Sequence, residues 1–119
     1  MIASFRISSA WPKTGGPYRD SLLQLASDWI MGSIDDEECL QEALSRRRGA
    51  VKKYDRFGKG NPESAAILTA MISDQDVLIS AVTNAIESQQ GAAGEFSRRE
   101  LLDAAVRDSA QKDGSNRGK

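Results

Sequence analysis

Residues 45–60, SRRRGAVKKYDRFGKG, carry the densest set of side chains that could contact an anion. Seven basic residues lie between positions 46 and 59, with Tyr54 and Phe57 among them. Cations hold phosphates and aromatic rings stack on bases, so this composition is typical of a surface that contacts nucleic acid. The candidate phosphate-contacting residues are Arg46, Arg47, Lys52, Lys53, Arg56 and Lys59.

The same stretch also has a purely structural explanation. Five acidic residues lie between positions 35 and 42, ahead of the bases. A helix favours negative charge at its start and positive charge at its end, so this gradient suits one helix. Glu42 precedes Arg46 by four residues, which is the spacing of an ion pair on one helix face. A solvated or protein-facing basic surface and a phosphate contact therefore both stay open, and we favour the first.

Catalytic and metal-binding chemistry is narrowly limited by composition. The chain has no histidine and a single cysteine, Cys39, which excludes histidine-based triads and His/Cys metal sites. The acidic run 35–38 fans around a first helical turn, and Asp74 and Asp76 point to different sides of a helix. The KTGG stretch at 13–16 lacks the GxxxxGK[ST] frame of a phosphate loop. We expect no enzyme activity, no cofactor and no metal.

Composition indicates one soluble domain. Apolar residues make up 39% of the 119 residues, and 16 basic residues stand against 17 acidic ones. Such a balance gives no overall field that draws the protein to nucleic acid or to an anionic membrane. No apolar run reaches the ~20 residues of a membrane span, and the start of the chain lacks a signal-peptide layout. A lone cysteine fits the cytoplasm, or a particle assembled there.

The fold class expected is all-α, a small helical bundle with an extended N-terminal arm and a disordered C-terminal tail. Residues 1–16 form the arm, because Phe5 and Ile7 alternate with polar residues and no second strand exists to pair with them. An intersubunit strand is the alternative for this segment. Residues 17–109 form the single helical domain, and residues 110–119 lack apolar periodicity and make up the tail.

A short helix-turn-helix hairpin opens the domain. The first helix begins between Pro17 and Ser21 and ends at Gly32, which suits a left-handed C-terminal cap. Asp35 caps the second helix, with Glu38 three residues later. This second helix continues past Tyr54 and is ended by the glycines at 58 and 60.

One long amphipathic helix and a short terminal helix follow. Asn61 and Pro62 open a helix that extends to about residue 89. Ser73 and Asp76 form an alternative capping box that would divide it, and we favour one continuous helix. Beyond a glycine-rich break, Ser97 caps the short C-terminal helix.

The long helix carries more apolar surface than two short helices readily cover. Its stripe is the predicted partner-binding surface: Ile67, Leu68, Met71, Ile72, Leu78 and Val82. Complete intramolecular cover is the alternative. The Ala/Ser-rich stretch 61–86 resembles subunits that polymerise in phage or secretion assemblies. The sequence therefore predicts a non-enzymatic protein–protein interaction module, either a self-associating assembly subunit or an adaptor. The alternative is a small nucleic-acid-associated regulator that uses the basic stretch 46–59.

Overall fold

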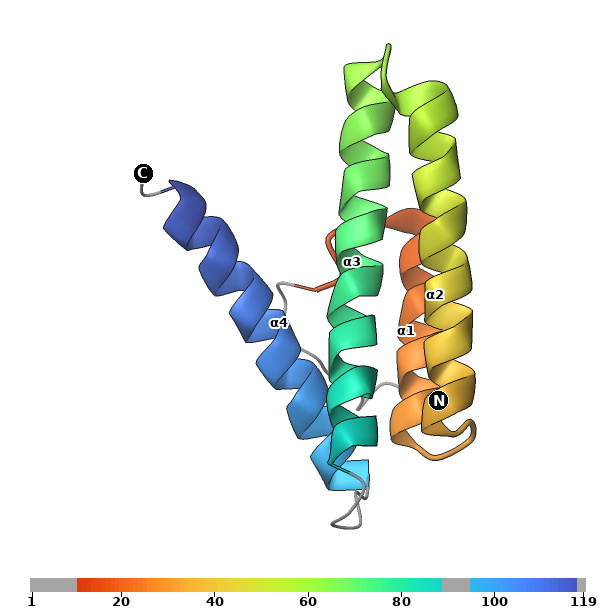
Figure 1. Cartoon of the computed structure of the whole chain (residues 1–119), viewed down its shortest axis with the longest axis vertical. Helices are drawn as coiled ribbons and strands as arrows, with labels where there is room; N and C mark the ends of the chain where they lie inside the picture. Colours follow the sequence, from red (N-terminus) through yellow and green to blue (C-terminus); the bar gives the residue numbers. More distant parts are fainter. Residues whose placement is uncertain (1–10, 89–94, 118–119) are drawn as a thin grey trace.

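The computed structural model describes residues 11–88 and 95–117, and these parts of the chain form a helical bundle (Figure 1). The elements in chain order are α1 (Gly16–Ile30), α2 (Asp36–Lys53), the π-helical turn η1 (Tyr54–Gly58), α3 (Pro62–Glu87) and α4 (Glu95–Arg117). The predicted all-α fold class is confirmed.

The hairpin formed by α1 and α2 has the turn chemistry that the sequence predicts. Gly32 has a φ of 85°, a conformation that favours glycine, and it reverses the chain after α1. Asp35 is the N-cap of α2 and its carboxylate accepts a hydrogen bond of 2.8 Å from the backbone N–H of Glu38. Both predicted positions are confirmed.

A single turn of π-helix prolongs α2 at the far end of the molecule. In η1 the ring of Tyr54 lies against Gly58, where an added Cβ would stand only 3.0 Å from the ring carbon Cδ2. Glycine therefore lets the tyrosine ring close over the backbone. The chain then turns, and the side chain of Asn61 caps α3 by accepting hydrogen bonds from the N–H groups of Glu63 and Ser64.

The long helix α3 is continuous from Pro62 to Glu87, as predicted, so the alternative break at Ser73 does not occur. By length and composition alone, α3 is also long and apolar enough to cross a membrane, with a mean hydropathy of 1.4 over its most apolar window of 18 residues. No uninterrupted apolar run of that length exists, because residues 73–76 interrupt it, but the alanines and large apolar residues on both sides of this polar stretch keep the mean hydropathy high. About 39% of that window is buried inside the bundle.

The core lies where α3 packs against its neighbours. Helix α3 makes its most extensive contacts with α2 and α4, while α1 packs on α2 and α4. Trp29 of α1 and Leu78 of α3 are the largest apolar side chains with no exposed surface in their helices. Leu102 and Val106 bring α4 into the same cluster. Figure 1 shows that α4 meets α3 near the end of α3 and diverges from it along its own length.

The two ends of the chain depart from the sequence expectation. The predicted arm lies partly outside the described residues, including Phe5 and Ile7, but residues 11–15 pack on the chain's own bundle, with Trp11 buried. Helix α4 begins at Glu95, so Ser97 lies inside the helix and not at its start. It also continues past residue 109 to Arg117, although Asp113, Gly114 and Asn116 have low helix propensity, so the lack of apolar periodicity after Ser109 does not mark the end of the helix. Residues 118–119 of the predicted tail lie outside the described residues.

Candidate functional site

The predicted partner-binding stripe on α3 is divided into two parts. Leu78 and Val82 have no exposed surface and Leu68 is buried, so these three residues belong to the intramolecular core. Ile67 is 58% exposed, and Met71 and Ile72 are half-buried. The part of the predicted stripe that stays accessible therefore lies in the first half of α3, and Leu68, Leu78 and Val82 are not part of it.

Two adjoining hollows on the protein surface meet at Tyr18 and Met71, and together we call them the Tyr18–Met71 groove. The first hollow measures about 400 Å³ and lies between the start of α1 and the first half of α3. The second measures about 320 Å³ and lies between α1 and α2. The lining residues are Lys13, Thr14, Gly15, Tyr18, Ser21, Arg46, Gly49, Ala50, Lys53, Ala66, Ile67, Ala70 and Met71.

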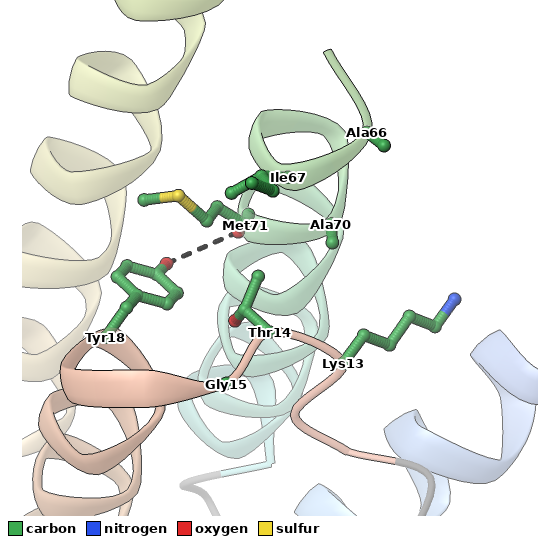
Figure 2. A pocket seen from close by; sticks show the side chains of 8 residues that line it. All are labelled: Lys13, Thr14, Gly15, Tyr18, Ala66, Ile67, Ala70 and Met71. Atoms are coloured by element: carbon green, nitrogen blue, oxygen red, sulfur yellow. Dashed lines mark hydrogen bonds between the residues drawn. The ribbon is translucent and has the colours of Figure 1, made fainter. Parts of the chain in front are cut away.

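The floor of the groove is apolar and its edges are basic. Figure 2 shows the ring of Tyr18 facing Met71, with Ile67 on the next turn of α3 and Lys13 at the border of the hollow. Arg46 and Lys53 stand at the border of the second hollow. Neither hollow has a carboxylate in its lining. The groove thus offers apolar contact with positive charge along the border of its second hollow.

The hydroxyl group of Tyr18 is held at the floor of this groove. It accepts a hydrogen bond of 2.7 Å from Nε2 of Gln75, while its own O–H reaches the carbonyl of Met71 only at 3.4 Å. That second distance is longer than a well-formed O–H···O bond, so the donor is weakly used. Burial raises the pKa of Tyr18, and the nearby carboxylate of Asp74 raises it further, against the lowering effects of Gln75 and Arg46.

Asp74 is a buried carboxylate whose role sequence reasoning missed. It has no exposed surface, and its oxygens accept hydrogen bonds from the N–H of Lys13 at 2.9 Å, the N–H of Thr14 at 3.0 Å and Oγ1 of Thr14 at 2.6 Å. Its backbone carbonyl accepts the indole N–H of Trp11 at 3.1 Å. The KTGG loop therefore does bind an anionic group, but that group is a side chain of the same protein. The available signal was that Asp74 and Asp76 point to different sides of the helix, so that one of them had to face the bundle.

The six candidate phosphate contacts fall into two groups. Nε of Arg46 pairs with Glu42 at 2.9 Å, as its spacing predicts, and Nε of Arg47 pairs with Asp76 of α3 at 2.6 Å. These two cations are partly satisfied within the molecule. The other four are exposed and contact no carboxylate among the residues that the structure describes: Lys52, Lys53, Arg56 and Lys59.

A third hollow of about 520 Å³ lies at the tip of the molecule, over the end of α2 and η1. It is lined by Lys52, Lys53, Asp55, Arg56 and Phe57. The ring of Phe57 is 59% exposed, which is unusual for an aromatic side chain. Basic side chains and an aromatic ring thus share one surface, as the sequence suggests. Lys53 also borders the Tyr18–Met71 groove, so the two regions adjoin.

A second buried carboxylate, that of Asp36, holds helices together. Asp36, one of the four consecutive acids, accepts a hydrogen bond of 2.7 Å from the indole N–H of Trp29 and lies 3.3 Å from Nη2 of Arg98. This pairing joins α1, α2 and α4.

Burial, with a smaller contribution from Asp36, raises the pKa of Cys39 to about 12, so its thiol stays protonated and is a poor nucleophile.

No group of three or more His, Cys, Asp or Glu residues that could hold a metal ion occurs in residues 11–88 and 95–117. The chain matches no protein-family model, no curated protein and no solved structure.

Proposed function

We propose that this protein is a non-enzymatic interaction module that self-associates, and that it docks through the Tyr18–Met71 groove. The observation that carries the proposal is the exposure of Ile67 beside the half-buried Met71, over an apolar floor that the bundle's own helices leave open. Exposed apolar surface gathered in a groove is a common feature of protein docking sites. Its use in a phage-type or secretion-type assembly rests on the sequence resemblance of residues 61–86.

The proposal treats α3 as a core helix of a protein that acts in the cytoplasm, and not as a membrane span. Two polar side chains in the middle of α3, Asp74 and Gln75, have no exposed surface and bind the loop before α1 and Tyr18. Exposing Asp74 to lipid would break these contacts at a cost of several kcal/mol. The free, buried thiol of Cys39 is in keeping with a reducing compartment.

Sedimentation and light scattering test this proposal. We expect the average mass of the wild type to rise with concentration, and Ile67→Glu to shift the protein toward monomer. Thr69→Glu is the matched control, because Thr69 is an exposed residue of the same helix that does not line the groove. A wild type that stays monomeric at several hundred micromolar and binds no apolar dye would contradict the proposal.

A specific observation favours a second candidate function, contact with a nucleic acid. The tip hollow combines Lys52, Lys53 and Arg56 with the exposed ring of Phe57. Phosphate contacts predict binding that weakens steeply with salt, so fluorescence anisotropy of a labelled single strand should show a steep salt slope. Replacing Lys52, Lys53 and Arg56 together by alanine should make the dependence of affinity on salt less steep. Arg48→Ala, outside the hollow, should change this dependence less. Binding that is indifferent to the triple substitution would exclude this candidate.

A further inference from the structure

The Tyr18–Met71 groove has a charge preference that narrows its choice of occupant. Arg46 and Lys53 border it, whereas the side chain of Lys13 extends away from Tyr18 and Met71 (Figure 2), and neither of its two hollows is lined by a carboxylate. The charge of Arg46 is met in part by Glu42, whereas Lys53 has no carboxylate partner among the described residues. An occupant that combines an apolar side chain with carboxylates therefore complements both the floor and the edges.

The opposite end of the same molecule presents such a combination. Met31, in the turn between α1 and α2, is 61% exposed, slightly more than Phe57 or Ile67. Asp35, Glu37 and Glu38 follow it closely and are exposed. Figure 1 places this turn at the end of the bundle opposite the α2–α3 connection.

The turn that carries Met31 is well ordered by its own backbone. The N–H groups of Met31 and Ser33 donate hydrogen bonds to the carbonyls of Ser27 and Asp28, at 2.9 and 2.8 Å. The positive φ of Gly32 fixes the reversal of the chain. Because this shape exists before binding, docking the turn costs little conformational entropy.

We propose that the groove receives the α1–α2 turn of a second copy of this chain. This inference rests on the proposed function and names its partner. Met31 of one copy lies on the apolar floor by Tyr18 and Met71, and the exposed acids Glu37 and Glu38 face the basic edges of the groove. The weakly used O–H of Tyr18 then has a carboxylate acceptor within reach.

The contact joins two different surfaces, so it is heterologous. Each copy retains one open groove and one open turn after pairing, and the subunits add head to tail into a ring or an open filament. The chain's own residues 1–10 are a poorer occupant, because they contain Arg6 and no carboxylate. Charge matching therefore favours the turn of another copy over residues 1–10.

A two-variant mixing experiment tests the heterologous contact. Ile67→Glu blocks the groove and leaves the turn intact, and Met31→Ser removes the apolar side chain of the turn and leaves the groove intact. Both residues are exposed, so the variants should keep the wild-type helicity and melting temperature. Each variant alone should associate at least about tenfold more weakly than the wild type. Thr69→Glu and Gln41→Ser are the matched controls.

Mixing the two variants should produce a dimer and no larger species, because only one functional groove and one functional turn meet. The wild-type assembly should also weaken as salt is added, and Glu37→Lys with Glu38→Lys should weaken it at fixed salt. Larger assemblies in the mixture, or no complex at all, would overturn the head-to-tail contact.

The outcomes separate this inference from the proposed function. If Ile67→Glu disrupts assembly while Met31→Ser assembles as the wild type does, the groove binds another segment, and the inference fails while the proposed function stands. If the wild type is monomeric at all concentrations tested, both fail.

Discussion

The two halves of α3 both carry apolar side chains at helical spacing, but their surroundings differ. Residues 62–72 carry apolar side chains at helical spacing, yet Ile67 is exposed and Met71 is only half-buried. Residues 73–87 continue the same spacing, and there Leu78 and Val82 have no contact with solvent. Helical periodicity thus marks the apolar side of a helix, but only the neighbouring elements decide whether that side is covered.

The side of α3 that faces α1 is covered only up to the level of the first turn of α1. Figure 1 shows α1 beside α2 and α3 along one part of their length only, and α4 leaving α3 as it proceeds. The change occurs near Asp74 and Gln75, two polar residues without exposed surface. Their side chains hold the loop before α1 and the first turn of α1 in place through Thr14 and Tyr18. The boundary between the halves is therefore a polar contact, and it can be broken selectively.

The largest effect is expected from removing apolar volume in the covered half. Leu78→Ala leaves a cavity in the core and should lower the free energy of unfolding by about 2–5 kcal/mol. Ile67→Ala removes a similar side chain from the open half and should change it by no more than about 0.5 kcal/mol. Urea denaturation followed by circular dichroism measures both. Equal losses would show that both halves are covered.

An intermediate effect is expected at the boundary. Asp74→Ala leaves the N–H groups of Lys13 and Thr14 without their acceptor and should cost about 2–3 kcal/mol. The emission of Trp11 should also shift to longer wavelength, because the loop that buries it is released. Asp76→Ala removes an exposed ion pair with Arg47 and should cost less than about 1 kcal/mol. A loss at Asp76 as large as that at Asp74 would contradict this assignment.

The smallest effect is expected from the hydroxyl group that links the groove to the boundary. Tyr18→Phe removes the acceptor of Gln75 and should cost about 1 kcal/mol. The pKa of Tyr18 is raised above 10.0 by burial first, so the protonated phenol is the form that the fold favours. Its contribution to stability is complete below pH 10 and is lost as the pH rises toward the raised pKa.

The difference in ultraviolet absorbance between wild type and Tyr18→Phe isolates the ionisation of this phenol. Its midpoint should lie above pH 10, and the wild type should lose more stability than the variant in that range. A midpoint at or below the ordinary value would show that the ring is solvated and that the groove floor is more open than described.

Local signals in the sequence predicted most of the fold. Asp35, Gly32 and Asn61 stand at the helix ends where their side chains or backbone freedom are needed, and the long helix is unbroken. The start of α4 was misplaced because Ser97 with Glu100 imitates a capping box inside a helix that begins at Glu95. A helix-start motif shows where a helix can begin, but it does not exclude a start a few residues earlier.

The site was harder to predict, because it depends on contacts between distant parts of the chain. The candidate stripe included Ile67 and Met71, but it also included Leu78 and Val82, which other helices cover. Spacing alone placed Asp74 and Asp76 on different sides of a helix, and the contact of Asp74 with Thr14 joins positions sixty residues apart. Nor does any local pattern mark Tyr18 as the residue shared by two hollows.

The close approach of Tyr54 to Gly58 limits which amino acids the π-helical turn η1 can accept at position 58. A methyl group at position 58 would require the ring of Tyr54 to move by a few tenths of an ångström, whereas one at the exposed Gly49 of α2 meets nothing within 4 Å. Alanine at 49 would even favour the helix by about 0.5–1 kcal/mol. In a library of random variants selected for folding, we therefore expect glycine to be retained more often at position 58 than at position 49, although both belong to the same basic stretch.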